Sequence, residues 1–153
     1  MNIAKSLGSL IARWRSEGIE ILPPEDEPTV VRVFKTVGSR ATGEVVALFG
    51  LLGGMSEMDN EYWKMWSLQE IVEANYVRSD AGILFSDYCM DCYQYRLKPI
   101  DAEVSEVWVE GFDFGPPVLV AGSLSEFFSA YQSNPDLVLN APPSRPEYDP
   151  RNA

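Results

Sequence analysis

Two cysteines are the first residues whose types and spacing suggest chemistry. Cys89 and Cys92 have the C-x-x-C spacing of a redox pair or of half a zinc site. A structural zinc site needs about four ligands, and the chain contains no further cysteine and no histidine to complete one. A redox pair would favour a strand-to-helix junction, whereas this motif lies between two predicted strands. We therefore interpret both cysteines as structural and expect no metal and no cofactor.

Carboxylates are the other candidates for chemistry. Glu57, Asp59 and Glu61 precede a predicted strand, and Asp87 and Asp91 flank the cysteine turn. Such groups could hydrolyse a glycosidic bond or bind a divalent cation. However, the sequence has no EF-hand spacing and no glycine-rich phosphate loop, and without histidine it lacks the commonest general base. A carboxylate-dependent hydrolase is therefore the weaker alternative, and we predict that the chain is not an enzyme.

The charge of the chain points instead to a protein partner. Twelve Lys and Arg residues against 23 Asp and Glu residues give a net charge of −11. Acidic residues are concentrated between Met55 and Asp113, a stretch that contains thirteen acidic residues and four basic ones. Nucleic acid and anionic membranes would be repelled, whereas a protein with a basic surface would be attracted. We expect no binding to nucleic acid or membranes.

The predicted partner-binding residues are the acidic side chains of the central stretch and one tryptophan among them. Trp108 alternates with Glu106 and Glu110 along a strand, on the face predicted to be solvated, whereas Trp66 is predicted to lie in the core. The predicted set consists of Glu57, Asp59, Glu61, Asp87, Asp91, Glu106, Trp108, Glu110 and Asp113.

Helical segments lie on both sides of the acidic centre. Apolar residues recur at helical spacing over residues 3–16, and further helices are predicted at about 28–37, 43–52, 68–75 and 124–133. Asp26 lies among the acidic residues before the second helix, and Thr42 can cap the third. Ser67 with Glu70 and Ser123 with Glu126 are each spaced as a capping box, which predicts the start of a helix.

One strand-like run precedes the predicted helix at 68–75, and four more lie between that helix and the last one. They cover residues 62–67, 83–88, 92–98, 104–110 and 117–121, and the runs at 92–98 and 104–110 alternate between the two faces. This alternation predicts an antiparallel sheet with one packed face. We therefore expect a single-domain α+β fold in which helices pack on one face of a sheet of about five or six antiparallel strands.

The order of these signals resembles the SUKH superfamily, which includes yeast cell-wall assembly regulators and many bacterial immunity proteins. The resemblance covers about residues 42–139. It is carried by six segments in order, which are Leu51–Gly54 followed by the acidic Glu57 and Asp59, Trp66–Ile71, Ile83–Asp87, Tyr93–Leu97, Val107–Val109 and Val118–Phe128.

The resemblance implies a non-catalytic immunity protein that binds and neutralises a cognate toxin, often a nuclease, of a polymorphic or contact-dependent toxin system. The alternative is a regulatory scaffold or adaptor without a toxin partner. Residues 1–40 would be a variable helical segment of the same domain, 41–139 the family-like core, and 140–153 a flexible proline-rich tail. The oligomeric state is left open.

The compartment follows from the same features. No apolar run reaches the roughly 20 residues that span a bilayer, and Arg13, Trp14 and Arg15 interrupt the amino-terminal one. Two cysteines are also few for a disulfide-held secreted protein of this kind. We expect a bacterial cytoplasmic protein.

Overall fold

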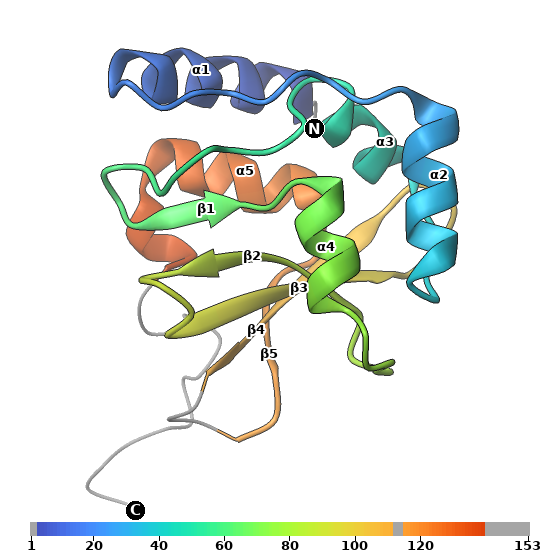
Figure 1. Cartoon of the computed structure of the whole chain (residues 1–153). Helices are drawn as coiled ribbons and strands as arrows, with labels where there is room; N and C mark the ends of the chain where they lie inside the picture. The colour runs from blue at the N-terminus through green and yellow to red at the C-terminus, as the bar shows by residue number, and fades with distance from the viewer. Residues whose placement is uncertain (1–2, 112–114, 140–153) are drawn as a thin grey trace, which may run out of the picture.

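The protein has an α+β fold in which helices cover one face of a five-stranded antiparallel sheet, as predicted (Figure 1). The structure is a computed structural model that describes residues 3–111 and 115–139. Its helices are α1 (Ile3–Ser16), α2 (Glu27–Thr36), α3 (Gly43–Phe49), α4 (Leu68–Ala74), α5 (Leu124–Ser133) and the short 3-10 helix η1 (Pro135–Leu137). Its strands are β1 (Trp63–Met65), β2 (Ile83–Tyr88), β3 (Tyr93–Pro99), β4 (Ser105–Gly111) and β5 (Val118–Ala121).

The helices begin where the capping residues predict. Asp26 and Thr42 accept hydrogen bonds from backbone N–H groups in the first turns of α2 and α3. At α4, the Ser67 hydroxyl accepts the N–H of Glu70, and the Glu70 carboxylate accepts the N–H of Ser67 at 3.0 Å. The predicted capping box at Ser67 is therefore confirmed.

The second predicted capping box is only half formed. Ser123 accepts the N–H of Glu126 at the start of α5, as predicted. The carboxylate of Glu126, however, accepts the N–H of Gly122 at 3.1 Å and does not return to Ser123. The helix begins at the predicted residue because the hydroxyl of Ser123 alone satisfies the backbone N–H of Glu126, the third residue of the helix.

The sheet is a simple meander in the order β1-β2-β3-β4-β5, with every neighbouring pair antiparallel. Tyr95 faces Val109 and Leu97 faces Val107, and these four side chains are buried. Arg96 faces Trp108 on the opposite side of the sheet. The alternation read from the sequence therefore assigns the packed face of β3 and β4 correctly.

Aromatic side chains fill the space between the helices and the sheet. The rings of Trp14 in α1 and Trp63 in β1 stack at 5.8 Å, and Tyr131 in α5 lies 5.3 Å from Trp63. Trp66 is buried as well, as predicted. In Figure 1, α1 lies beside α5 above the sheet, so the amino-terminal segment belongs to the core.

The predicted tail and the absence of a membrane-spanning helix are the remaining expectations about the fold. Residues 140–153, for which a flexible tail is predicted, lie outside the described residues. Within residues 3–111 and 115–139, none of the helices combines the length and hydrophobicity needed to cross a bilayer.

Candidate protein-binding surface

One end of the sheet carries an unusual backbone conformation. Four non-glycine residues have positive φ: Tyr62 at 68°, Cys89 at 56°, Met90 at 54° and Asp91 at 69°. Tyr62 precedes β1, and the other three form the turn between β2 and β3. The two loops touch, because the N–H of Cys89 donates to the carbonyl of Tyr62 at 2.8 Å. Left-handed backbone costs roughly 1–2 kcal/mol for such residues, and strain of this kind clusters at functional sites.

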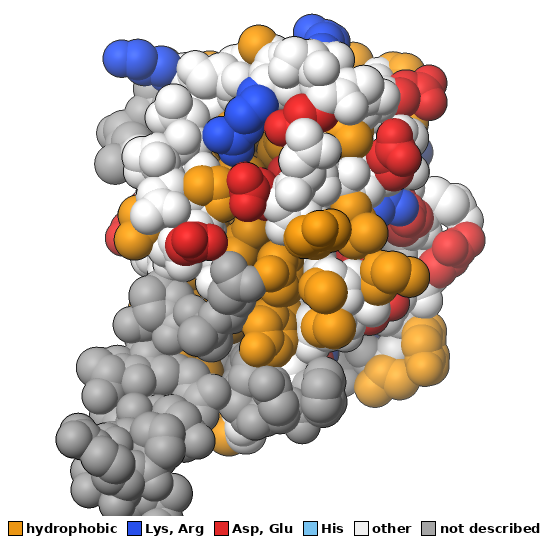
Figure 2. All heavy atoms as spheres, turned by 90° about the vertical axis from the view of Figure 1, so that its left-hand side faces the viewer, with side chains coloured by type: hydrophobic (Ala, Val, Ile, Leu, Met, Phe, Trp, Pro, Cys, Tyr) orange, Lys and Arg blue, Asp and Glu red, His pale blue; other side chains and the backbone are white. Residues whose placement is uncertain are grey.

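Large apolar side chains are exposed at the same end. Met90 is 78% exposed, Tyr62 58% and Leu137 in η1 46%. The rings of Tyr88 and Tyr93, which flank the turn, stack at 5.9 Å. Figure 2 looks onto this end and shows hydrophobic side chains gathered in its middle with Asp and Glu side chains beside them. We call Tyr62, Tyr88, Met90, Tyr93 and Leu137 the turn surface.

Carboxylates surround the turn surface. Glu61, Asp91 and Asp136 are exposed beside it. Burial raises the pKa of the Tyr88 phenol, and the negative charges of Asp136 and Glu61 contribute to the same rise. Aromatic and Met side chains with a charged rim have the composition of protein-binding hot spots.

Asp59 was predicted to bind a partner as a solvated carboxylate, and this prediction is wrong. The side chain lies beneath the turn surface and is only 4% exposed. It accepts hydrogen bonds from the Trp14 indole at 2.8 Å and from the Tyr131 hydroxyl. Its other oxygen accepts the N–H groups of Glu61 at 2.9 Å and Trp63 at 3.0 Å. Asp59 therefore holds the loop that carries Tyr62 onto the core.

Asp87 is also buried and supports the turn from within. It accepts the Trp66 indole N–H at 2.6 Å and the backbone N–H of Asp91 at 3.1 Å. Burial raises the pKa of the Asp87 carboxyl, although both hydrogen bonds act in the opposite direction. Asp87 therefore positions Asp91.

An acidic hollow of about 660 Å³ adjoins the turn surface between α4 and the β2–β3 turn. Its lining contains five carboxylates and one lysine, together with the apolar side chains of Met58, Trp66, Ala74 and Met90; the charged residues are Glu57, Lys64, Glu70, Glu73, Asp87 and Asp91. The hollow thus brings together three of the predicted residues, Glu57, Asp87 and Asp91.

The single lysine of the hollow is already paired. Lys64 Nζ lies 2.8 Å from the carboxylate of Glu70. Burial would raise the pKa of Glu70, but the hydrogen bonds from Lys64 and from Ser67 outweigh it and the pKa is lowered. The remaining carboxylates of the hollow keep its net charge negative, and a basic partner would be attracted to it.

The other predicted cluster, on β4, is largely neutralised. Glu110 forms an ion pair with Arg96 of β3. Trp108 donates its indole N–H to Glu106 at 3.1 Å, and Lys98 Nζ lies 5.8 Å from the centre of its ring. Glu106 and Trp108 are therefore not brought together with the carboxylates of the turn, and the indole is half-buried. Glu110, in contrast, lines a further hollow together with Asp91 of the turn. Asp113 lies outside the described residues.

Sequence reasoning missed the apolar residues of the turn surface. Tyr62 lies in a run predicted to be a strand, and neither Tyr62 nor Met90 is among the predicted partner-binding residues. No local signal predicts this conformation, because hairpin loops of four residues are most often built around a type I turn, whose central residues have negative φ.

The cysteines lie in a turn between two strands, as predicted, no disulfide joins them, and Cys89 is exposed. Over the part of the chain that the structure describes, no three Cys, His, Asp or Glu side chains are placed to hold a metal ion together.

Comparison of the chain with models of known protein families gives no match, and a search among curated proteins gives none either.

Proposed function

We propose that this protein is an immunity protein that binds a cognate toxin through the turn surface and the acidic hollow beside it. The observation that carries the proposal is the coincidence of strain, exposure and charge at one end of the sheet. All four left-handed non-glycine residues of the described chain lie there, and Tyr62 and Met90 are exposed among carboxylates. The resemblance of residues 42–139 to the SUKH superfamily supplies the class of partner.

Binding would neutralise the toxin by steric blockade. The negative hollow would speed the encounter with a basic protein, such as a nuclease, whose own surface is built to attract phosphate. The apolar centre of the turn surface would then provide the desolvated contacts that hold the complex together. In this proposal the protein acts in the cytoplasm of the cell that makes the toxin.

Co-expression with the product of the neighbouring reading frame tests the proposal. We expect a complex that co-purifies, and we expect the double variant Tyr62→Ala with Met90→Ala to weaken binding by about thirty-fold, the effect of losing one or two hot-spot side chains. Tyr76→Ala is the matched control, because Tyr76 is 85% exposed and lies outside the turn surface.

Two outcomes would count against the proposal. Failure to form a complex with any adjacent toxin-like protein would remove the immunity function. Equal weakening by the Tyr76 variant and the double variant would remove the turn surface as the binding site. Weak binding to several unrelated proteins would favour the scaffold or adaptor alternative.

A further inference from the structure

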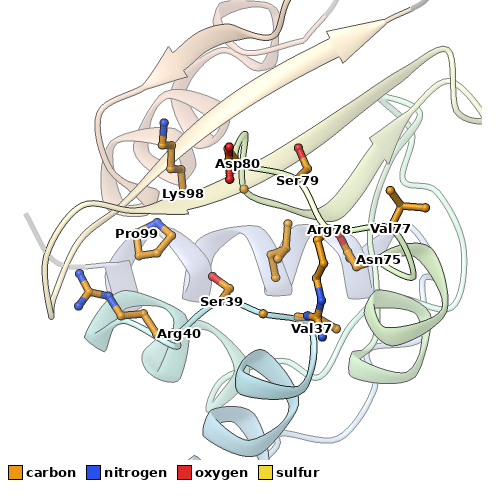
Figure 3. Close-up of a pocket in the computed structure, with 13 residues that line it drawn as sticks. Val37, Ser39, Arg40, Asn75, Val77, Arg78, Ser79, Asp80, Lys98 and Pro99 are labelled. Atoms are coloured by element: carbon orange, nitrogen blue, oxygen red, sulfur yellow. The ribbon is translucent and has the colours of Figure 1, made fainter.

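A second hollow lies at the end of the sheet opposite the turn surface, and three basic residues line it (Figure 3). The hollow measures about 710 Å³ and lies between residues 37–40 after α2, residues 75–82 after α4, and the end of β3. Its lining includes Arg40, Arg78 and Lys98 but only one carboxylate, Asp80. Two net positive charges therefore surround this hollow in a chain whose net charge is −11.

Arg78 is an exposed side chain in the wall of the hollow, and its guanidinium lies against a glycine. A Cβ atom at Gly38 would lie 2.4 Å from Nη1 of Arg78, and Gly38 has φ of +83°. The guanidinium thus lies directly against the backbone of Gly38, and Figure 3 shows the Arg78 side chain extending toward Val37. Glycine is favoured here by both its conformation and the close approach.

The other walls are held by buried hydrogen bonds. The side chain of Asn75 donates to the carbonyls of Ile71 at 2.8 Å and Leu84 at 2.9 Å, and accepts the N–H of Leu84 at 2.8 Å. At Gly82, with φ of +101°, a Cβ would lie 2.3 Å from the carbonyl oxygen of Leu97. The loop that carries Arg78 is therefore fixed at both ends, which favours a preformed site.

The cations of this hollow are available for a ligand. Among the described residues, ion pairs join β1 to α4 and β3 to β4, and none includes Arg40 or Arg78. Lys98 contacts the Trp108 ring through a cation–π interaction and is otherwise exposed. Arg40 is close enough to the exposed Asp101 to help lower its pKa, after the hydrogen bonds from the backbone of residues 103 and 104.

We propose that this hollow binds a small organic anion whose phosphate or carboxylate group is attached to an apolar body. The anionic group would meet Arg78, because guanidinium groups bind oxyanions through charge-assisted hydrogen bonds. The apolar body would lie on Val37, Ile83 and Pro99, which also line the hollow. The site is independent of the proposed toxin-binding function, because it shares no residue with the turn surface.

Titration of the full chain with phenyl phosphate, followed by two-dimensional amide NMR, tests the proposal, with inorganic phosphate in a parallel arm. We expect shifts of the amide signals at residues 37–40, 75–82 and 98, and weaker binding of inorganic phosphate. Arg78→Gln should weaken phenyl phosphate binding by about ten-fold or more, the fold-change expected for a lost hydrogen bond to a charged group. Arg32→Gln is the matched control, since Arg32 is exposed on α2 outside the hollow.

Each result decides between the alternatives. Shifts that avoid these three segments, or equal weakening by Arg78→Gln and Arg32→Gln, would overturn the site. Equal affinity for inorganic phosphate and phenyl phosphate would show that the apolar residues of the hollow do not contribute to binding.

Discussion

Asp59 and Trp14 are joined by a buried hydrogen bond of 2.8 Å between a carboxylate oxygen and the indole N–H. This bond links the amino-terminal helix to the loop before β1, across 45 positions of sequence. Because Tyr131 of α5 donates to the same oxygen, one carboxylate connects three separate parts of the chain. The loop that carries Tyr62 is thus fixed to the core from below.

The first prediction follows from this arrangement. Asp59→Ala should lower the free energy of unfolding by about 3 kcal/mol, because the donors on Trp14 and Tyr131 would be left buried without an acceptor. Urea unfolding followed by tryptophan fluorescence measures the loss. Glu61→Ala is the control, since this neighbouring carboxylate is exposed and should change stability by less than about 0.5 kcal/mol. Equal stability of the two variants would contradict the assignment.

The second prediction concerns pH. Burial raises the pKa of Asp87 above its usual value of 3.8. As pH rises through the window that starts at 3.8, the unfolded chain loses this proton while the folded protein keeps it, so the folded state is disfavoured. The stability of the wild type should therefore fall relative to that of Asp87→Asn between about pH 3.5 and 7. Urea unfolding of both proteins across this range measures the difference.

Asp26→Asn provides a control of opposite sign. The hydrogen bonds from Thr29 lower the pKa of the exposed Asp26 carboxyl below 3.8. The stability contributed by this group is present above pH 3.8 and is lost as pH falls through the lowered value. The wild type should therefore gain stability relative to Asp26→Asn as pH rises. The same sign in both comparisons would contradict the buried environment of Asp87.

Local signals in the sequence predict much of this fold, whereas the environments of side chains depend on long-range contacts. Ser67 marks the start of α4 because a cap needs only the next three residues. Asp59 could not be placed in the same way, because its partners Trp14 and Tyr131 are distant in sequence and nothing near Asp59 indicates burial. Likewise, Glu110 is neutralised only because the register of β3 against β4 brings Arg96 within reach of its carboxylate.

The third prediction uses two glycines with different surroundings. Gly82→Ala should destabilise the protein by about 2 kcal/mol or more, since the added Cβ would collide with the backbone of β3 at Leu97 and φ is +101°. Gly8→Ala, in α1, should stabilise it by about 0.5–1 kcal/mol, because nothing lies within 4 Å and alanine favours the helix. Thermal unfolding of both variants tests this pair, and a loss of stability in both would contradict the environment assigned to Gly8.

The fourth prediction asks whether the strain in the β2–β3 turn serves binding. Met90 has φ of 54° and is 78% exposed, so Met90→Gly relieves left-handed strain and removes little buried surface. The relief is offset by the greater entropy of glycine in the unfolded chain, so stability should stay constant or rise by up to about 1 kcal/mol. Chemical unfolding measures this change without any partner.

Affinity should change in the opposite direction. If the turn surface binds the partner, Met90→Gly should weaken binding by about ten-fold or more, because an exposed apolar anchor is lost and the turn becomes less preorganised. Met90→Leu keeps an apolar side chain of similar size and should retain most of the affinity. Calorimetric titration of the purified toxin with each variant compares them. Full affinity in Met90→Gly, or a marked loss of its stability, would show that the left-handed turn is not held in place for binding.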